Sequence, residues 1–570
     1  MSLLPRYHWK RRLAPELPGP RGTTGYALLD ALLHSRSIQT PEAMRRYLDP
    51  LSGPALSPFE VPGVHEATAL IRWAIARDQR ILVHGDYDAD GLSATALLVR
   101  GLLSLGARAR AFIPNRLDTG YGLSLDTVAE LAAGAELLIT VDCGIRSIDE
   151  VARARELGMS VIVSDHHLPG PALPAADALV TTRLPSSPVT DELAGVGVAY
   201  QIWRGLEEVS RRFGGAASSL DGGMLDLVAL GTVADVAPLV GENRRLVRAG
   251  LLQLRRSTHP GLAALAHSAG IEPSSMSAES ISFGLAPRIN AAGRLGSAEP
   301  ALELLLTEDV ARAQQLAQEL SRANRVRQDE VQRCLERAQA TRPEADLRDS
   351  PLIFTVSDEY PQGIVGLVAG KLADSYAVPV VAVTLEGDKA HGSIRSPEWF
   401  NASEALEGCS RWLDKHGGHS KAAGFTCAAE AIDRVEQHLR DRAERACVDG
   451  TPRAELEYDA ELPPVLPDQP VWEHLALLEP VGEGNPAPVF VSRAVPVLRK
   501  SSMGRDGVHL RLLLRSDDSE IGAVAFRRGE ALAQIGDRVD IAYTLDEHTY
   551  NGSTERRLNI VDLAEPGQGG

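Results

Sequence analysis

The sequence contains few cysteines, no long apolar run and very little lysine. Its five cysteines form no Cys-x-x-Cys pair, which argues against a disulfide framework or a zinc knuckle and favours a reducing cytosol. No apolar run approaches the roughly 20 residues that span a bilayer, so no membrane association is expected. Residues 1–12 carry positive charge, but no apolar segment follows as in a signal peptide. We therefore expect a cytoplasmic protein.

The charge of the chain does not identify its partner. The formal net charge is −17, and only six of the 59 basic residues are lysine. Codon bias in a GC-rich genome explains this excess of arginine better than adaptation to phosphate does. Net charge governs solubility and non-specific binding, whereas a single groove can carry the opposite sign. A nucleic-acid partner is neither indicated nor excluded.

The length of 570 residues indicates several domains, because a single hydrophobic core does not grow to that size. From Val64 to about Leu239, helical and strand-like patterns alternate, which predicts an α/β domain with a parallel sheet and helices on both faces. Helical periodicity dominates from Gly241 to Arg342 and includes one long helix from Thr307 onward. The α/β alternation resumes after Asp349, and short strands typical of a β-barrel follow residue 486.

These patterns divide the chain into five parts. The predicted parts are a lead-in (1–60), a parallel-sheet domain (61–240), a helical connector (241–348), a smaller α/β domain (349–450) and a β-barrel for which an OB-fold is one candidate (455–565). The expected helices are 41–47, 93–105, 147–157, 307–342 and 363–376. The expected strands are 81–83, 137–141, 161–163, 352–356, 378–383, 488–491, 508–514, 521–526, 538–543 and 557–563. The tail, 565–570, is expected to be disordered.

Acidic and histidine side chains follow three predicted strands, where each strand ends. The run HGDYDADG (84–91) follows an apolar stretch, as does SDHH (164–167), and Asp142 ends a third stretch. Ligands of α/β sheets bind at the carboxyl ends of the strands. Clustered Asp and His there would form a divalent-metal site, and such sites commonly carry out phosphoryl chemistry.

The first acidic run has two alternative interpretations. Its spacing matches the start of a calcium EF-hand loop, but position twelve is Leu97 rather than Glu, and a strand precedes it rather than a helix. A solvated acidic loop is the other alternative. If the chain stays extended past the strand, residues of one parity point the same way. These residues are His84, Asp86, Asp88 and Asp90.

The second run, Asp-His-His, is rarer than the first. A hydrogen-bonded core pair of histidines is a weaker explanation for it, because the run precedes a Pro-Gly-Pro turn at a strand end. Asp142 adds a carboxylate, whereas Cys143 has the opposite parity and is expected to be packed. Asp235 ends an apolar helical stretch, and on its own it would be a cap or a loop acid.

The number of candidate ligands suggests two metal ions. The six side chains are His84, Asp88, Asp90, Asp142, His166 and Asp235. A pair of ions roughly 3.5–4 Å apart, bridged by Asp142, would activate water and stabilise the leaving oxygen. Carboxylate-rich ligation with some imidazole favours Mn²⁺, with Mg²⁺ second. His167, taken as unligated, would then act on the phosphate.

Four further segments have residues suited to phosphate binding, although each alone is more often a structural turn. They are PRINAAGR (287–294), expected as a loop; GSIRS (392–396), with Ser393 and Arg395 of shared parity; the Gly-rich turn around Gly417, Gly418 and His419; and, more weakly, the segment 114–122 with Arg116. Backbone N–H groups and guanidinium groups in such turns can hold an anion.

At these residues the chain resembles the DHH phosphoesterase superfamily and, within it, the bacterial RecJ single-strand exonucleases. The resemblance covers about residues 60–565. Its motifs are HGDYDADG, VDCG, DHH, GTVAD, PRINAAGR, GSIRS, GGH and VGEGNPAPVF. It implies a DHH parallel-sheet domain, a DHHA1 domain and a trailing OB-fold that binds single strands.

The resemblance also implies roles for individual residues. The six ligand candidates would bind the metals, with Asp86 nearby and His167 assisting at the scissile phosphate. Arg288, Asn290 and Arg294 would contact the strand, and His419 would lie near it. Arg116, Ser393 and Arg395 would hold a 5′-terminal phosphate. The chain departs from the family pattern at Tyr360–Gly363 and at Thr181–Pro185, neither of which involves a predicted ligand.

By this resemblance we expect a monomeric 5′→3′ exonuclease that digests single-stranded DNA to mononucleotides in repair and recombination. The single-stranded-DNA-binding protein and a helicase are its candidate partners. Two alternatives remain. A relative acting on short oligoribonucleotides or small phosphoesters would generally lack the trailing barrel. A non-catalytic replication scaffold would usually have lost ligands, whereas all six positions here carry ligand-type residues.

Overall fold

The computed structural model describes residues 3, 5–12, 24, 26–115, 122–212, 224–256, 259–340, 350–447, 452–464, 469–504, 507–516, 519–550 and 553–569. The chain forms two compact units. One comprises residues 42–327 together with 476–487, and the other comprises residues 1–41, 328–475 and 488–570. Each unit is described by itself below.

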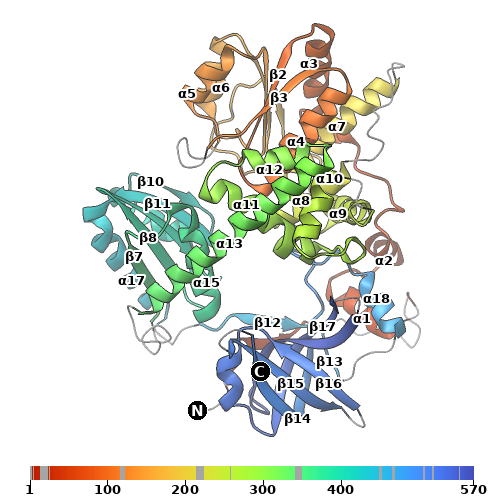
Figure 1. Ribbon diagram of the computed structural model, residues 1–570, viewed down its shortest axis with the longest axis vertical. Coiled ribbons are helices and arrows are strands. Elements are labelled where there is room, and N and C mark those ends of the chain that lie inside the picture. Colours follow the sequence, from red (N-terminus) through yellow and green to blue (C-terminus); the bar gives the residue numbers. More distant parts are fainter. Residues whose placement is uncertain are drawn as a thin grey trace. The chain divides into compact units, whose positions relative to one another are not determined.

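The first unit is built on a five-stranded sheet in the order β3-β2-β4-β5-β6 (Figure 1). All of its neighbouring strands are parallel. The strands are β2 (Arg80–Gly85), β3 (Arg108–Phe112), β4 (Leu137–Val141), β5 (Ser160–Ser164) and β6 (Ala178–Val180). The central strand β4 is buried along its whole length, as expected when helices cover both faces of a parallel sheet.

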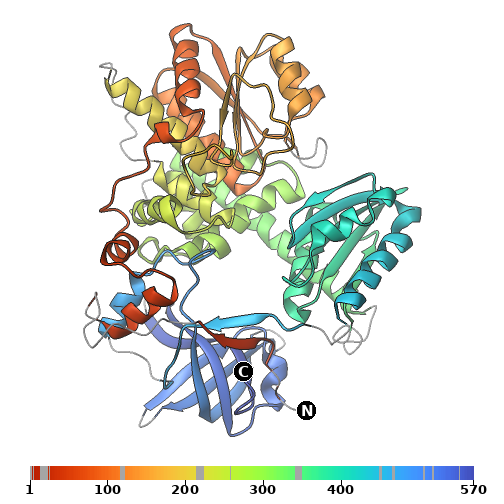
Figure 2. The same cartoon turned by 180° about the vertical axis from the view of Figure 1, so that it is seen from behind.

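Helices cover both faces of this sheet, as predicted (Figure 2). On one side lie α5 (Leu125–Ala132) and α6 (Ile148–Glu156), which pack on Leu82, Leu138 and Val161. The other side is covered by α3 (Val64–Ala76), α4 (Ala89–Ser104) and α7 (Gly195–Arg212). Side chains of alternate parity on the strands enter the two cores, which is the period-two geometry of a β-strand.

The helix after the first acidic run begins earlier than predicted. Helix α4 starts at Ala89 rather than at Ser93, and Asp88 is its N-cap residue. The Asp88 carboxylate accepts hydrogen bonds from the backbone N–H groups of Asp90 and Gly91. Asp is among the strongest N-cap residues because it satisfies the open donors of the first turn. The expectation of an extended chain as far as Asp90 is therefore wrong.

The rest of the first unit is helical, as predicted from Gly241 onward. Its elements are α2 (Pro41–Leu48), α8 (Leu225–Ala234), α9 (Gly241–Leu254), α10 (Pro260–Ser268), the π-helical turn η3 (Ser280–Leu285), α11 (Ala286–Leu295), α12 (Glu299–Leu306) and α13 (Val310–Ala340). Helix α13 confirms the predicted long helix and continues into the second unit. The segment 287–294, expected as a loop, is the body of α11. Its proline occupies the first turn, where no N–H donor is needed. None of the described helices is long and apolar enough to cross a bilayer.

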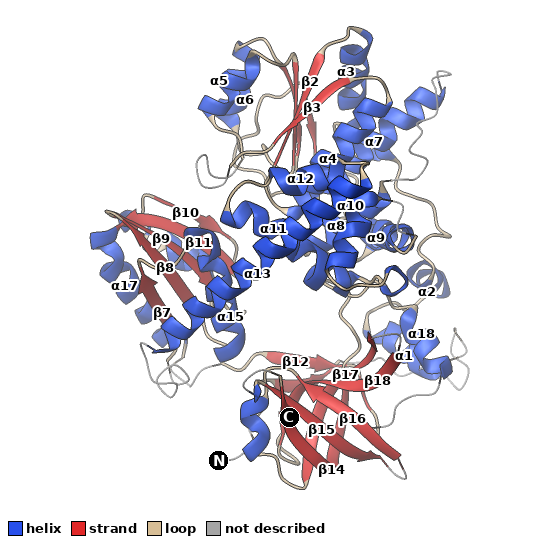
Figure 3. Cartoon of the chain, viewed as in Figure 1, coloured by secondary structure: helices blue, strands red, loops and turns tan. Residues whose placement is uncertain are grey.

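The second unit contains a five-stranded sheet in the order β10-β11-β9-β8-β7. Its strands are β7 (Ile353–Ser357), β8 (Val380–Glu386), β9 (Lys389–Arg395), β10 (Lys415–Gly418) and β11 (Ala422–Ala428). One face packs on α16 (Ala402–Glu407) and α17 (Ile432–Ala446), and the other packs on α15 (Val365–Tyr376) and the end of α13 (Figure 3). The predicted alternation is confirmed.

The same unit contains a six-stranded barrel sheet in the order β13-β14-β15-β16-β18-β17, closed by pairing between β14 and β17. Its elements are β13 (Ala460–Glu461), β14 (Phe490–Met503), β15 (His509–Ser516), β16 (Ser519–Ala525), β17 (Arg538–Tyr550) and β18 (Ser553–Ala564); α18 (Gln469–Ala476) precedes β14. Strand β14 is much longer than predicted. Register shifts on both sides of Pro496 let one strand pair with two neighbours, which is how a bulge bends a sheet toward closure.

The two ends of the chain are joined to this barrel. Strand β1 (His8–Arg11) pairs with β12 (Glu455–Tyr458). Helix α1 (Ala27–Ser35) follows, and Arg36 pairs with the buried Asp459. The predicted disorder of the tail is wrong for its described residues, because the N–H of Glu565 donates to Leu3 and that of Gly567 to Asp540.

Asp562 is the polar centre of this junction. Its carboxylate is fully buried and accepts hydrogen bonds from the N–H groups of Arg6 and Tyr7 and from the indole of Trp9. It also pairs with the buried guanidinium of Arg528 at 2.8 Å. One side chain thus connects the N-terminal segment to strand β18.

Replacing Asp562 by Ala is expected to destabilise the barrel by about 3–5 kcal/mol, because the buried Arg528 charge would lose its partner. The measurement is urea unfolding of the full chain, followed by hydrogen exchange of barrel amides. Glu547→Ala is the matched control, because Glu547 is 44% exposed in its pair with Arg556 of the same barrel; its cost should be below about 1 kcal/mol. Equal effects of the two substitutions would contradict this account of the junction.

Candidate metal centre and active site

Three neighbouring strands of the parallel sheet end at one place. Strand β4 lies between β2 and β5, with His84 opposite Thr140 and Val141 opposite Ser164. Asp142 is the first residue after β4, and Asp165 is the first after β5. The register alone therefore brings histidine and acidic side chains from all three strands to the carboxyl edge, where α/β sheets bind their ligands.

The acidic run reaches this edge through a helix N-terminus. Both carboxylate oxygens of Asp90, in the first turn of α4, accept backbone hydrogen bonds from the start of α7. Gly195 donates at 2.7 Å and Val196 at 2.9 Å. Gly231 of α8 allows the close approach, because a Cβ atom there would lie 2.6 Å from an Asp90 oxygen. Two helix N-termini thus hold Asp90, and the positive ends of their dipoles favour a carboxylate.

Backbone strain occurs at one predicted ligand and directly after another. Asp142 adopts a left-handed conformation with φ of 59°, and Val236, directly after Asp235, has φ of 60°. This region is uncommon for non-glycine residues and exceptional for a β-branched one. Each such residue costs on the order of 1–3 kcal/mol, and such residues cluster at functional sites. The fold therefore tolerates strain where it positions these two carboxylates.

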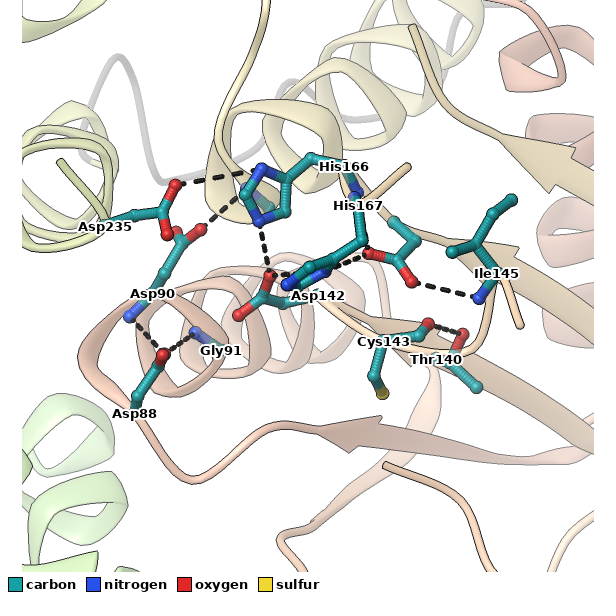
Figure 4. A network of polar contacts seen from close by, with 12 residues as sticks. Asp88, Asp90, Gly91, Thr140, Asp142, Cys143, Ile145, His166, His167 and Asp235 are labelled. Atoms are coloured by element: carbon teal, nitrogen blue, oxygen red, sulfur yellow. Dashed lines mark hydrogen bonds and ion pairs between the residues drawn. The ribbon is translucent and has the colours of Figure 1, made fainter. Parts of the chain in front are cut away.

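His166 lies between two acidic side chains (Figure 4). Its Nε2 atom is 3.1 Å from an oxygen of Asp142, and its Nδ1 atom is 3.7 Å from an oxygen of Asp235. Asp235 is the C-cap residue of α8, so this helix brings a further carboxylate to the edge of the sheet. The imidazole joins carboxylates that are about 90 residues apart in sequence.

Three overlapping groups of side chains could each hold an ion, with ligand atoms within 4.8 Å of one another. They are Asp86, Asp88 and Asp142; Asp142, His166 and His167; and Asp90, His166 and Asp235. Asp142 and His166 each belong to two groups. The arrangement is therefore one continuous cluster with room for more than one ion.

Burial and mutual repulsion make this cluster costly to ionise. Burial, followed by the charges of Asp88 and Asp90, raises the pKa of Asp142 well above its usual range. The same causes raise the pKa of Asp235 to about 9 and, through burial and Asp88, that of Asp90 to about 7. Close-packed carboxylates of this kind need a cation to stay charged.

The two histidines have the form that metal ions bind. Burial lowers the pKa of both His84 and His166 to about 4, so each imidazole is neutral near pH 7. The Nε2 atom of His84 is buried and accepts or donates no hydrogen bond among the described residues. A buried polar atom usually has a partner. A neutral imidazole nitrogen and several carboxylates therefore fit divalent ions such as Mn²⁺.

Asp165 organises the second motif, and sequence reasoning assigned it no role. It is 1% exposed. One oxygen accepts hydrogen bonds from the N–H groups of His166 and His167 and from Nδ1 of His167 at 2.8 Å. The other accepts from the N–H of Ile145. Burial alone would lower the pKa of His167, but the hydrogen bond and charge of Asp165 outweigh it and raise that pKa.

The position of Asp165 gave a signal that was available in the sequence. Asp is the first residue of the Asp-His-His triplet and follows the last residue of the strand directly. A carboxylate there can reach two N–H groups of the same turn, as in an Asx-turn. It therefore fixes the orientation of the histidines rather than adding another ligand to the three groups.

The residues predicted to contact the DNA strand lie on different sides of helix α11. Asn290 lies at the metal cluster, where its side-chain oxygen accepts a hydrogen bond from the N–H of Ala89 at 2.8 Å. Arg288 points elsewhere: it donates to the carbonyl of Gly284 and to the hydroxyl of Ser321. Arg294 lies in the last turn of the same helix. Arg116 lies outside the described residues.

The remaining predicted phosphate contacts belong to the second unit. Ser393 and Arg395 lie on β9, and Nη1 of Arg395 donates to the Ser393 hydroxyl at 3.0 Å. Gly417 and Gly418 end strand β10, and the N–H of His419 donates to Ala422 in the turn that follows. Gly418 has φ of 139°, a conformation that favours glycine. Tyr360, at one departure from the family pattern, is buried against Thr355.

Models of three known domain families match this chain. Residues 80–232 match the N-terminal domain of the DHH family, residues 349–445 match the DHHA1 domain, and residues 458–562 match the RecJ OB domain. The match to the DHH family model contains all three strand ends of the metal cluster. The match to the RecJ OB domain contains the barrel.

Relatives align along almost the whole chain. The single-stranded-DNA-specific exonuclease RecJ of Thermus thermophilus is 35% identical, with 99% of this chain and 78% of the relative covered. RecJ of Bacillus subtilis is 34% identical, with 94% of this chain and 68% of the relative covered. The crystal structure of Thermus thermophilus RecJ with Mn²⁺ matches with a TM-score of 0.80 at 34% identity, over 99% of this chain and 79% of that one. This chain therefore belongs to the RecJ family of DHH proteins.

Proposed function

We propose that this protein is a single-stranded-DNA-specific exonuclease that hydrolyses phosphodiesters from the 5′ end and releases mononucleotides. The observation that carries the proposal is the convergence of Asp and His side chains from three strand ends and helix α8 into one buried cluster. Membership of the RecJ family, whose curated relatives are named for this activity, supports the same substrate.

The cluster has the donor set for two Mn²⁺ ions, with Mg²⁺ as an alternative; crystal structures show Thermus thermophilus RecJ in complex with each of these ions. One position is offered by Asp86, Asp88 and Asp142, and another by Asp90, His166 and Asp235. We place Asp142 between the two and assign His84 as an additional ligand. When bound, such ions supply a hydroxide nucleophile and neutralise charge on the phosphate.

His167 is assigned to the substrate. Its Nδ1 atom is engaged by Asp165 at 2.8 Å, so the ring would meet a phosphate through Nε2. The side chain is 35% exposed, whereas that of Asp142 is only 3% exposed. Asp165 is the group that orients this ring, as a third residue does in other catalytic sites. His167 would hold a phosphate oxygen, and Asp165 would act as a positioning residue.

Residues outside the cluster are assigned roles in binding the DNA strand. Asn290 contacts the acidic run directly and is placed to meet a nucleotide bound there. In the second unit, the fork of Arg395 and the hydroxyl of Ser393 lie side by side, which suits a terminal phosphate. The turn at Gly417, Gly418 and His419 is assigned a contact to the strand, and the barrel a role in binding its bases and backbone.

Two other proposals remain weaker. A small-phosphoester or oligoribonucleotide hydrolase needs no barrel, whereas residues 458–562 match the RecJ OB domain. A non-catalytic scaffold needs no ligands, whereas the candidate ligand positions described above are all occupied by Asp or His. Action together with the single-stranded-DNA-binding protein and a helicase is also proposed, and it rests on the family resemblance alone.

The reaction is tested with single strands labelled at either end, in Mn²⁺. We expect immediate release of labelled mononucleotide from the 5′ label and late release from the 3′ label. Asp142→Ala should abolish both, because the side chain shared by two ligand groups is lost.

Three outcomes of this assay would overturn the proposal. Early release from the 3′ label would reverse the polarity. Digestion confined to very short oligomers would indicate a small-phosphoester enzyme. Strand binding by the unmodified protein without any cleavage would indicate a scaffold.

Metal binding is tested apart from activity with Asp142→Asn. Removing one of several repelling carboxylates should raise the melting temperature of the metal-free protein, and Asn tolerates the left-handed backbone at this position. The same variant should bind Mn²⁺ at least about 100-fold more weakly by calorimetry. It should lose the Mn²⁺-induced gain in stability, which is about 2.7 kcal/mol for a ligand at 100 times its Kd.

The matched control is Asp149→Asn, the same chemical change at an exposed site on helix α6. It should alter neither quantity. If Asp142→Asn melts at a lower temperature and still binds two ions, Asp142 has only a structural role.

Recognition of the 5′ end of the DNA strand is tested with Arg395→Gln. Loss of a charged hydrogen-bond donor costs about 1.5–3 kcal/mol, so the preference for a 5′-phosphate over a 5′-hydroxyl end should fall by about 10- to 150-fold. The measurement is kcat/KM for two oligonucleotides that differ only in that group. Arg442→Gln is the control, since Arg442 pairs with Glu404 at 2.9 Å on the same unit. An unchanged preference would remove Arg395 from this role.

A further inference from the structure

Helices α10 and α13 of the first unit enclose a polar groove. Its volume is about 540 Å³, and its lining includes His267 and Ser268 of α10 and Ser321, Arg322 and Arg325 of α13. The α13 residues are three and four positions apart, so they share one face of the helix. The hydroxyls of Ser268 and Ser321 lie 2.9 Å apart across the groove. None of the predicted metal ligands lines it.

The three arginines in the middle of α13 differ from the others of that helix, and two of them, Arg322 and Arg325, line the groove. Elsewhere on the helix, Arg312 pairs with Glu303, Arg333 with Glu330 and Arg337 with Glu359. In contrast, Arg322, Arg325 and Arg327 form no ion pair with any carboxylate among the described residues. A helix that neutralises its arginines at both ends leaves three charges uncompensated in its middle. Such a cluster attracts anions.

A fourth guanidinium joins this cluster from helix α11. The Nε atom of Arg288 donates to Ser321 at 3.2 Å, which places it on the wall shared with α13. Arg288 and Asn290 are about 200° apart around the helix. Helix α11 thus presents its amide to the metal cluster and its guanidinium to the groove. Burial and the charge of Arg325 lower the pKa of Arg288, and burial and the charge of Arg288 lower that of Arg327.

An exposed aromatic ring lies next to these charges in the chain. Phe283 precedes Gly284, whose carbonyl accepts the second hydrogen bond of Arg288. Phe283 is 78% exposed, the largest fraction among the large hydrophobic side chains of the described ranges. It belongs to the π-helical turn η3, and such turns are frequent at functional sites. Exposed aromatics beside arginines are what single-stranded nucleic acid uses for stacking and charge neutralisation.

We propose that the α10–α13 groove is a second strand-binding site, which holds backbone phosphates of single-stranded DNA on Arg322 and Arg325, with Arg288 beside them, while a base stacks on Phe283. The proposal rests on the proposed function, because it extends the contact of the same substrate beyond the metal cluster. The shared chemistry is recognition of phosphate, which a strand or a free phosphate ion could satisfy.

The arrangement of the charges favours a strand. Arg322 and Arg325 project into the groove from α13, and Arg288 reaches the same wall from α11. Guanidiniums contributed by two different helices can contact successive phosphates of a chain. A free phosphate would also make no use of the ring of Phe283.

The experiment measures DNA binding in EDTA, where no cleavage occurs, by fluorescence anisotropy of the full-length protein. The double variant Arg322→Gln/Arg325→Gln is compared on oligonucleotides of about 25 and about four nucleotides. For the long one we expect an affinity loss on the order of 10-fold, with the salt slope reduced by about 1.4, since each phosphate contact to a single strand contributes about 0.7. Binding of the short one, and its cleavage in Mn²⁺, should not change.

Matched variants separate charge from fold. Arg211→Gln/Arg212→Gln removes the same charge from exposed positions on α7 and should leave both affinities unchanged. Arg322→Lys/Arg325→Lys should restore most of the salt slope. Phe283→Ala should weaken binding of the long oligonucleotide and leave the slope unchanged, because stacking releases no counterions.

The outcomes discriminate between the possible ligands. Equal binding of the long oligonucleotide by the double variant and the unmodified protein overturns the proposal. Competition by millimolar inorganic phosphate at the groove, seen as a change in Phe283→Trp fluorescence without any response to DNA, would assign the site to a free anion and also overturns it. Absence of cleavage by the unmodified protein would refute the proposed function alone, because these binding measurements do not depend on it.

Discussion

The structure of the first unit depends on holding several carboxylates close together without a cationic side chain among them. Burial and mutual repulsion raise the pKa of Asp90, Asp142 and Asp235. A protein could relieve this by placing Arg or Lys in the cluster. For Asp90 the compensating groups are instead backbone N–H donors at helix N-termini. The remaining negative charge of the cluster can therefore be neutralised by a divalent ion.

This constraint explains features that are distant from the ligands in sequence. Gly195 and Gly231 have no side chain where Asp142 and Asp90 approach the helices most closely. Asp142 accepts a left-handed backbone, and the strain is tolerated because strand β4, paired with β2 and β5, fixes the backbone directly before it. Asp165 accepts hydrogen bonds from the turn that contains the histidines. Each of these features fixes the position of a side chain at the edge of the sheet.

The sequence predicted those parts of the site that follow from strand periodicity and chain register. Apolar stretches ending in Asp or His locate the edge of the sheet, because parallel strands align their carboxyl ends. It failed where a local cap or a distant helix decides the conformation. Asp88 starts α4 four residues early by capping it. The segment 287–294 has the Gly and Arg of a phosphate loop, but its apolar Ile289 and Ala292 pack in the core as a helix. The local turn made by Asp165 follows from its position in the sequence, whereas its bond to Ile145 does not, because pattern alone does not place Ile145.

The two kinds of charge in the first unit are kept apart for a physical reason. A guanidinium inside the carboxylate cluster would satisfy the acids and replace the ion, so phosphate-binding arginines must lie elsewhere. Arg183, whose charge acts on Asp235 and His166, donates instead to the His166 carbonyl. Helix α11 achieves the same separation within two residues, with Asn290 toward the acids and Arg288 toward α13. A chain of net charge −17 can thus bind an anionic polymer, because attraction depends on where the arginines are left unpaired and not on their total.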